Sequence, residues 1–288
     1  MMNGIPTIVK WAGGKKQLLA KFESFFPKKK INRYYDPFVG GGAVALYVIK
    51  RLKPKEVYLS DINEELINCY KMIQEDVEGL IVLLKEYKQL HSEKFYYEMR
   101  KKDPKILSRL QRAGRFIYLN KTCFNGLYRV NSKGEFNVPM GTYKNPAICQ
   151  EADLREAHDL LKNAVVEVKQ FDKAVETAKK GDFVYFDPPY YPLKKDSFTT
   201  YTKESFLEKE QEKLAKVFKE LAKEHVDTML SNSDTEFIRA LYKGYLTETV
   251  DATRMINCNA EGRGKIKEVV VTSPTLSEKI AELASASK

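Results

Sequence analysis

Hydrophobic positions along the chain fall into short apolar runs separated by longer stretches with helical spacing. The runs that predict strands lie at 34–39, 56–60, 164–168, 182–187, 226–231, 245–250 and 266–272. The stretches that predict helices lie at 43–52, 63–73, 77–90, 173–180, 204–224 and 234–243, with a further helix expected after Pro274. Strands that alternate with helices predict an α/β fold with a mostly parallel sheet. The last two strands have no strong helix between them and are expected to pair antiparallel.

Between residues 91 and 160 the strand signal fades, and the chain is helical and loop-like. The simplest organisation is one α/β domain, formed by 1–90 and 161–288, that is interrupted by a mainly helical insertion at 91–160. Much of the positive charge falls in this insertion, since residues 100–145 hold eleven basic side chains against two acidic ones, a net charge of +9. The basic residues are Arg100, Lys101, Lys102, Lys105, Arg109, Arg112, Arg115, Lys121, Arg129, Lys133 and Lys144.

Six aromatic residues are interleaved with these cations, which suits a polyphosphate partner that also offers bases for stacking. A solvated helix face is the alternative interpretation of the same charges. The whole chain has 288 residues and a net charge of +10, a size that can bury a sizeable core without disulfides. No apolar run is long enough to span a membrane, and the N-terminus has no secretory signal pattern.

The four cysteines and three histidines form no CxxC, HxH or HExxH pattern. We therefore expect no disulfide framework and no zinc site, and a reduced cytoplasmic setting.

A glycine run follows the first predicted strand, in Asp36-Pro37-Phe38-Val39-Gly40-Gly41-Gly42, and precedes a helix. Glycines at such a turn allow the backbone to approach a ligand closely. Asp61 ends the next predicted strand, about 20 residues on, where an acid reaches ribose hydroxyls in nucleoside-binding βαβ units. The pattern is neither GxGxxG nor a P-loop. A plain turn is the structural alternative.

A second motif, Asp187-Pro188-Pro189-Tyr190, ends the apolar run Phe183–Phe186. Two prolines fix the backbone at the carboxyl edge of the sheet, where α/β proteins bind ligands. The corner offers two acceptors, the Asp187 carboxylate and the Pro188 carbonyl, beside the flat ring of Tyr190. An exocyclic amine on a planar base needs such acceptors, because its lone pair is otherwise delocalised into the ring. A Pro-rich surface turn is the alternative.

Taken together, these motifs resemble the Dam family of DNA adenine-N6 methyltransferases (D12 class). The resemblance also includes Trp11-Ala12-Gly13-Gly14-Lys15, Ser60-Asp61-Ile62-Asn63, Tyr118-Leu119-Asn120, Phe124–Arg129, Gly134–Pro139, Ser231-Asn232 and the late Asn259, Arg263 and Glu268. It covers about residues 8 to 272 in the order of the family. It implies a Rossmann-like S-adenosylmethionine-dependent methyltransferase fold, with 91–160 as an inserted target-recognition domain.

The resemblance also implies a role for each matching residue. The cofactor-binding positions would be Trp11, Lys15, Phe38, Gly40, Gly42, Asp61, Phe171, Asp172 and Asp187. The catalytic positions, which would receive a flipped adenine, are Asp187, Pro188 and Tyr190. Extrusion of the base costs a few kcal/mol of stacking. No metal and no covalent enzyme intermediate are implied.

In the insertion, the family's DNA-binding positions correspond to Phe124, Asn125, Leu127, Arg129, Pro139 and Tyr143. Arg129 matches the reader of the first guanine of GATC, where a guanidinium can bond O6 and N7 together. Phe124 stands where the family carries a wedging aromatic residue, although here it lacks a hydroxyl group. Core packing for Phe124 and Leu127, and a phosphate contact for Arg129, are the alternatives.

The resemblance makes duplex DNA containing GATC the first expected substrate, with S-adenosylmethionine as methyl donor. N4 methylation of cytosine, methylation of RNA and a DNA-binding module without catalysis remain alternatives. A cognate restriction endonuclease acting on the same site is an expected partner, and a monomer in the cytoplasm is the expected state.

Overall fold

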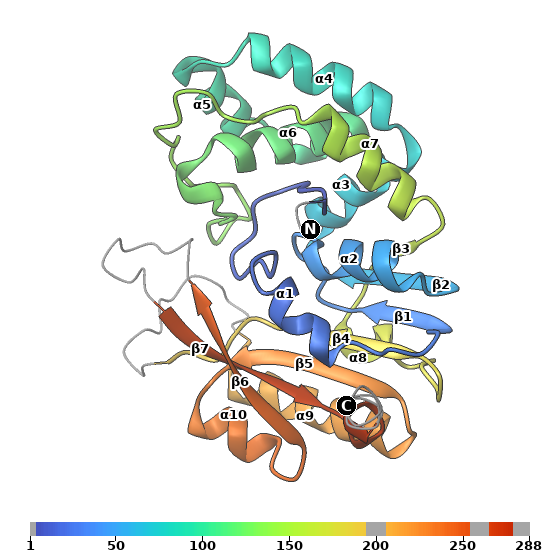
Figure 1. The fold of residues 1–288 in the computed structure, drawn as a ribbon. Coiled ribbons are helices and arrows are strands. Elements are labelled where there is room, and N and C mark those ends of the chain that lie inside the picture. The colour runs from blue at the N-terminus through green and yellow to red at the C-terminus, as the bar shows by residue number, and fades with distance from the viewer. Residues whose placement is uncertain (1–3, 194–205, 254–264, 279–288) are drawn as a thin grey trace.

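The computed structural model describes residues 4–193, 206–253 and 265–278. Its centre is a seven-stranded sheet in the order β3-β2-β1-β4-β5-β7-β6 (Figure 1). The strands are β1 (Arg33–Asp36), β2 (Glu56–Asp61), β3 (Val165–Val168), β4 (Phe183–Phe186), β5 (Asp227–Ser233), β6 (Leu246–Thr253) and β7 (Lys265–Thr272). This confirms the α/β fold expected from the alternating pattern.

The first five strands in chain order pair in parallel, and β7 then pairs antiparallel with both β5 and β6. The expected antiparallel pair at the end of the chain is therefore confirmed. A parallel sheet that ends in such a pair matches the methyltransferase fold that the resemblance implies. No helix in the described part of the chain is long and apolar enough to cross a membrane.

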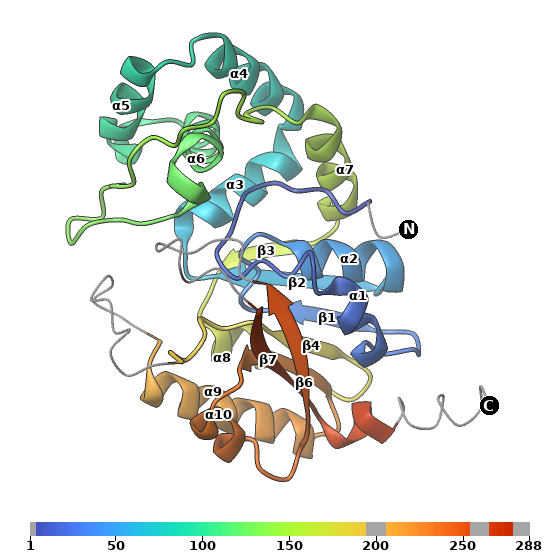
Figure 2. The same cartoon turned by 60° about the vertical axis from the view of Figure 1, so that its left-hand side comes forward.

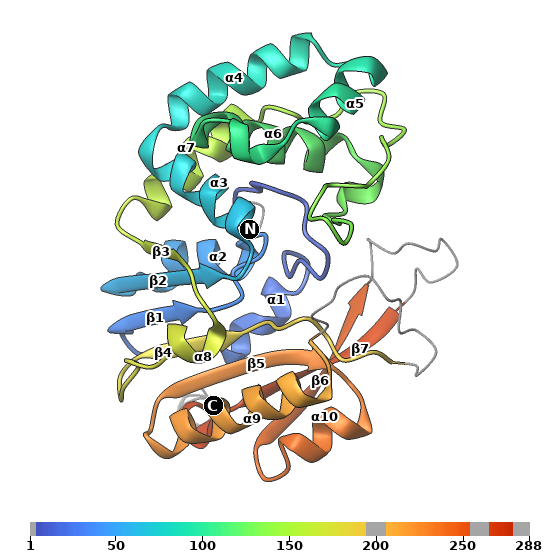
Figure 3. The same ribbon diagram turned by 180° about the vertical axis from the view of Figure 1, so that it is seen from behind.

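Side chains of the central strands alternate between the two faces of the sheet. Tyr34 and Phe183 belong to the apolar core on the face of α1 (Leu19–Phe22) and α2 (Ala43–Leu52). Tyr35 and Val184 belong to the core on the other face, under α9 (Glu208–Lys223) and α10 (Glu236–Leu241). The period of two follows from strand geometry. Turning the molecule shows helices on both faces of the sheet (Figures 2 and 3).

Helices α4 (Val77–Gln89), α5 (Glu93–Lys101), α6 (Arg109–Thr122) and α7 (Glu151–Leu161) form a group on the β3 side of the sheet (Figure 1). Helix α3 (Glu64–Glu75) joins this group to β2 and packs against α6. Buried residues of these helices continue the core of the α2 face without a break. A domain boundary at residues 90 and 91 therefore stays a prediction.

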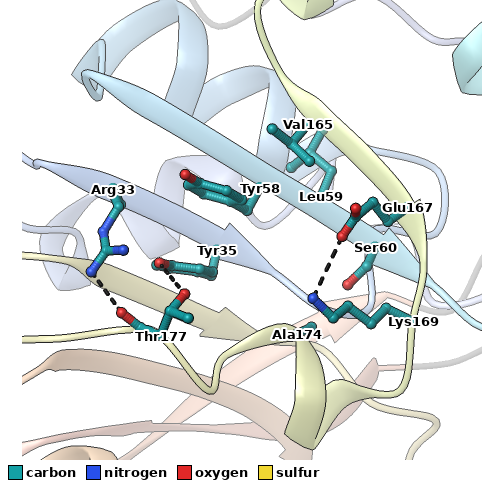
Figure 4. A pocket seen from close by; sticks show the side chains of 10 residues that line it. All are labelled: Arg33, Tyr35, Tyr58, Leu59, Ser60, Val165, Glu167, Lys169, Ala174 and Thr177. Carbon is teal, nitrogen blue, oxygen red and sulfur yellow. Dashed lines mark hydrogen bonds and ion pairs between the residues drawn. The ribbon is translucent and has the colours of Figure 1, made fainter.

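The segment expected to form a helix over 173–180 differs from the prediction. Its helix, α8, covers only Phe171–Ala174, and turns follow up to β4. A cavity of about 410 Å³ lies between this segment and β1–β3, with the stacked rings of Tyr35 and Tyr58 on its wall (Figure 4). In place of a longer helix, the Thr177 carbonyl accepts from Arg33 and the Thr177 hydroxyl shares a hydrogen bond with the Tyr35 hydroxyl, and these bonds tie the turn to β1.

The other predicted helices are confirmed with small shifts at their ends. The expected helix after Pro274 is present over 274–278 in the described part of the chain. Of the late residues that carry the family resemblance, Asn259 and Arg263 lie outside the described residues, whereas Glu268 is described on β7.

Candidate active site

The glycine turn after β1 and Asp61, the acid that ends β2, meet at the carboxyl edge of the sheet. The Gly40 N–H donates to Asp61 Oδ2 over 3.2 Å, and the Asn63 N–H donates to Asp61 Oδ1 over 2.9 Å. Burial raises the pKa of Asp61, while these backbone N–H groups act against the shift. The carboxylate is thus held in one orientation beside the turn. Each oxygen keeps a second lone pair that can accept from a ligand hydroxyl.

Glycine is required at this turn for two reasons. Gly40 and Gly42 have φ values of 47° and 75°, which disfavour residues with a Cβ. A Cβ on Gly42 would lie 2.3 Å from the Tyr70 hydroxyl, and one on Gly40 would lie 2.8 Å from Trp11 Cδ1. The Tyr70 hydroxyl also donates to the Gly40 carbonyl over 2.9 Å. Trp11 and Tyr70 therefore pack directly on the turn, and the glycines admit them.

A cluster of aromatic side chains lies next to the glycine turn, on the face of the sheet that α9 and α10 cover. Phe38 and Phe171 stack with centroids 5.4 Å apart, and Phe206 meets both rings edge-on. Beside Phe171, Asp172 Oδ2 lies 3.0 Å from Lys213 Nζ. Asp172 Oδ1 is buried and has no hydrogen-bond partner among the described residues. A buried acceptor without a donor is costly, so this atom suits the amino group of a bound nucleoside.

The Asp-Pro-Pro-Tyr corner follows β4 and is held by residues from distant parts of the chain. Asp187 Oδ1 lies 2.9 Å from Lys15 Nζ and accepts a hydrogen bond of 2.8 Å from Ser231 Oγ. Ser231 shares a further hydrogen bond of 2.8 Å with the Tyr185 hydroxyl. The Lys15 side chain is only 3% exposed, so its ammonium is committed to this corner. One carboxylate oxygen of Asp187 is therefore fixed from two sides.

Of the other acceptors in this corner, one already receives a hydrogen bond from the protein and two do not. The Pro189 carbonyl accepts from Gln211 Nε2 over 2.9 Å. Within residues 4–193, 206–253 and 265–278, no hydrogen bond is recorded to Asp187 Oδ2 or to the Pro188 carbonyl. These two acceptors lie on adjacent residues, so the corner can accept two hydrogens from one amine.

Tyr190 completes the corner. Its hydroxyl donates to Glu268 Oε2 over 2.7 Å, and Lys15 Nζ lies 4.5 Å from the centroid of its ring. Ser231 and Glu268 had no role in the sequence-based hypothesis, although both belonged to the segments that carried the resemblance. Each lies in a strand run that holds other polar residues, so its residue type alone gave no signal.

Asp36 is a second carboxyl group near Asp187, at the end of β1. It is only 2% exposed, and its Oδ2 accepts from the Tyr34 hydroxyl over 3.1 Å. Burial, and then the negative charge of Asp187, raise the pKa of Asp36 to about 8. The folded chain therefore keeps Asp36 largely protonated at neutral pH, so Asp36 adds little negative charge beside Asp187.

The predicted DNA-binding residues lie in the loops that follow α6. Phe124 is 41% exposed, and its N–H donates to the Pro139 carbonyl over 2.9 Å. Asn125 adopts a φ of 54°, and Leu127 packs partly against the core. The loop is tied to the N-terminal segment by Asn120, which donates to the carbonyls of both Lys10 and Gly126. Leu127 is thus partly packed and partly exposed, whereas Phe124 faces solvent, and the DNA-binding role of both stays a prediction.

Arg129 lies in the hairpin that these loops form. Its Nε donates to Asn137 Oδ1 over 2.7 Å, which orients the guanidinium. Pro139 is exposed, and Tyr143 is 37% exposed with Lys10 Nζ 3.9 Å from its ring centroid. The structure therefore brings the six predicted residues into one loop region and leaves Phe124, Pro139 and Tyr143 accessible.

Several basic residues of the 100–145 segment are engaged by other groups of the protein and are less available to bind DNA phosphates. Arg109 forms a two-pronged pair with Glu75, and Arg112 pairs with Glu65. Arg115 is 5% exposed and donates to two backbone carbonyls of the α5 end. Lys121 is 4% exposed, and burial lowers its pKa to about 8. Two of the eleven cations are thus buried and two more are paired with acids, while the nucleic-acid partner expected from the whole cluster stays a prediction.

Comparisons with known proteins identify close relatives. The model of the D12 class N6 adenine-specific DNA methyltransferase family matches residues 11–256. The Type II methyltransferase M.MjaIII of Methanocaldococcus jannaschii is 45% identical over 275 residues, covering 90% of this chain and 95% of the relative. The Type II methyltransferase M1.LlaDCHI of Lactococcus lactis is 41% identical, covering 92% and 94%. The DNA adenine methylase of Haemophilus influenzae is 37% identical, covering 91% of each chain.

The described residues contain no group of three or more His, Cys, Asp or Glu side chains that could hold a metal ion.

Proposed function

Because the chain belongs to the D12 class of N6 adenine-specific DNA methyltransferases, we propose that it methylates the N6 amine of an adenine flipped out of duplex DNA. The observation that carries this proposal is the state of the corner after β4. Asp187 Oδ1 is fixed by Lys15 and Ser231, whereas Oδ2 and the Pro188 carbonyl have no recorded donor in the described chain.

The residues of the site fit S-adenosylmethionine, which supplies an electrophilic methyl group. Asp61 would accept from the ribose hydroxyls, and Asp172 Oδ1 would gain the donor that it lacks. Phe38, which is half-buried, would contact the cofactor beside Asp172, and the buried ring of Phe171 stacks behind it. Gly40 and the adjoining turn would contact the methionine end. Trp11 and Gly42 would act mainly by shaping this turn, since they pack within it.

The target amine would be activated by hydrogen-bond acceptance. Its lone pair is delocalised into the purine ring, so it is a poor nucleophile in the free base. Asp187 Oδ2 and the Pro188 carbonyl would accept its two hydrogens and localise the lone pair on nitrogen. Tyr190 would stack on the base and recover part of the cost of extruding it, which is a few kcal/mol.

Residues 91–160 would form the target-recognition domain, with GATC as the expected site. Arg129, oriented by Asn137, would bond O6 and N7 of a guanine. Phe124 would wedge into the duplex, and Asn125, Leu127, Pro139 and Tyr143 would provide further contacts. The names of two relatives are those of type II methyltransferases, which favours a restriction endonuclease acting on the same site as partner. We further propose a cytoplasmic monomer.

The test is to methylate mixed-sequence duplex DNA with the purified protein and to map the modified positions. We expect N6-methyladenine within GATC. Asp187→Ala should lower the rate by roughly a hundredfold or more, because the amine loses an acceptor in a preorganised site. Asp159→Ala, which removes an exposed carboxylate on α7, is the matched control and should keep the rate.

N4-methylcytosine as the product would contradict the proposal, as would an Asp187→Ala variant that keeps the rate of the unsubstituted protein. Sensitivity of methyl incorporation to RNase would point to an RNA substrate instead.

A further inference from the structure

The orientation of the Tyr190 ring is not determined by the motif that contains it. Pro188 and Pro189 each fix their own φ angle, and so fix the path of the backbone into residue 190. The two side-chain torsions of Tyr190 stay free of that constraint, and rotation about them would carry the ring away from the corner. A stacking platform for a flipped base therefore needs a contact at the far end of the ring.

That contact comes from Glu268 on β7. The Tyr190 hydroxyl donates to Glu268 Oε2 over 2.7 Å, and Glu268 is only 5% exposed. Its position is set by the sheet, since Glu268 lies opposite Ser233 of β5 and Val250 of β6. Glu268 thus lies on β7, whose backbone is paired with β5 on one side and with β6 on the other.

The choice of a carboxylate has a chemical consequence for the ring. When Glu268 is ionised, a phenol that donates to it carries more electron density, because charge-assisted hydrogen bonds are about twice as strong as neutral ones. Lys15 Nζ lies 4.5 Å from the Tyr190 ring centroid and also contacts Asp187. An electron-rich ring attracts this ammonium more strongly. Glu268 therefore supports both the angle of Tyr190 and the cation that fixes Asp187 Oδ1.

We propose that Glu268 is a positioning residue for methyl transfer, which holds the Tyr190 ring at the angle that receives the target base. The inference rests on the proposed function of Tyr190 as a stacking platform. If so, the antiparallel strand β7 helps to position the ring on which the target base stacks.

A double-mutant cycle on the full-length protein tests this role. Tyr190→Phe removes the donor, and Glu268→Ala removes the acceptor. Each should lower kcat about tenfold or more, the value of a hydrogen bond to a charged group. The double variant should lose no more than the larger single loss, because the contact that Tyr190→Phe breaks is already lost in Glu268→Ala. Glu268→Gln, which keeps an acceptor oxygen, should restore most of kcat, and KM for the cofactor should not change.

Glu248→Gln is the matched control, because Glu248 is an exposed carboxylate on the neighbouring strand β6. It should leave kcat unchanged. Losses that multiply in the double variant, or full activity in Glu268→Ala, would overturn the inference. If Glu268→Ala does not fold, Glu268→Leu, which also removes the acceptor but leaves a smaller cavity, takes its place in the cycle.

Failure of the proposed function has a different signature, because the unsubstituted protein would then put no methyl group on adenine N6. In that case the cycle is measured on the free energy of unfolding, where strictly additive losses overturn the coupling of Tyr190 to Glu268.

Discussion

Asp36→Asn should change how the stability of the protein depends on pH. The Asp36 carboxyl is 2% exposed and accepts from the Tyr34 hydroxyl and, over 3.3 Å, from the Phe38 N–H. Burial, and then the charge of Asp187, raise its pKa from the ordinary value of 3.8 to about 8. Asparagine is nearly isosteric, cannot ionise, and keeps an oxygen for these donors.

The sign of the effect follows from proton binding. Between about pH 4 and pH 8 the folded chain holds the Asp36 proton, whereas the unfolded chain has released it. Stability from this group is therefore greatest below the unfolded pKa and is lost as the pH rises toward 8. One proton gives a slope of roughly 1.4 kcal/mol per pH unit. From pH 5.5 to pH 7.5 the loss comes to about 2–3 kcal/mol.

The measurement is urea unfolding of the unsubstituted chain and of Asp36→Asn at about pH 5.5, 6.5 and 7.5. The difference in free energy of unfolding between the two proteins should move in favour of the variant by about 1 kcal/mol or more per pH unit. Asp159→Asn, an exposed carboxylate on α7, should run parallel to the unsubstituted chain. Parallel curves for Asp36→Asn would refute the view that this buried carboxyl is protonated.

Three further predictions concern other contacts of the active site and of the DNA-binding loops. Ser231→Ala should slow methyl transfer by about tenfold to a hundredfold in a single-turnover assay, since Asp187 loses a donor at 2.8 Å; an unchanged rate would contradict that role. Gly42→Ala should lower the free energy of unfolding by about 1–3 kcal/mol, because of its φ of 75° and the contact with Tyr70, and unaltered stability would count against this strain. Arg129→Ala should cost roughly 1–3 kcal/mol of discrimination at one guanine, as measured with single-base variants of the site. Lys133→Ala in the same hairpin is the comparison and should weaken DNA binding evenly across sequences, so an even loss with Arg129→Ala as well would mark a phosphate contact.

The strands of the sheet could be predicted because each one is marked by a local pattern in the sequence. The runs that became β1, β2 and β4 are short, apolar and each followed by a glycine, acid or proline stop. Position 173–180 shows where such signals fail. Its spacing suits a helix, but Thr177 bonds to Arg33 and Tyr35 on β1, and the chain turns instead. Tertiary contacts of this kind leave no trace in the local pattern.

The charges of the insertion could be counted in the sequence but not assigned to a surface. Arg115 and Arg112 lie on one helix, and both look like surface cations by residue type. The structure buries the first against carbonyls of the preceding helix and pairs the second with Glu65 on α3. Which cation faces solvent depends on how α3, α5 and α6 pack. Fewer phosphate contacts than the charge total implies are therefore available, and the salt dependence of DNA binding should be correspondingly shallower.

The corner after β4 depends on register, which explains why its supporting residues were missed. Ser231 and Ser233 lie two apart on β5, and Glu268 lies directly opposite Ser233 on β7. Side chains on a strand alternate between faces, so a shift of one residue in this pairing would turn Glu268 to the opposite face of the sheet. The Tyr190 hydroxyl would then lose the acceptor that it has at 2.7 Å. The geometry of the motif at residues 187–190 is thus set by a strand near the end of the chain, through a pairing that no local pattern specifies.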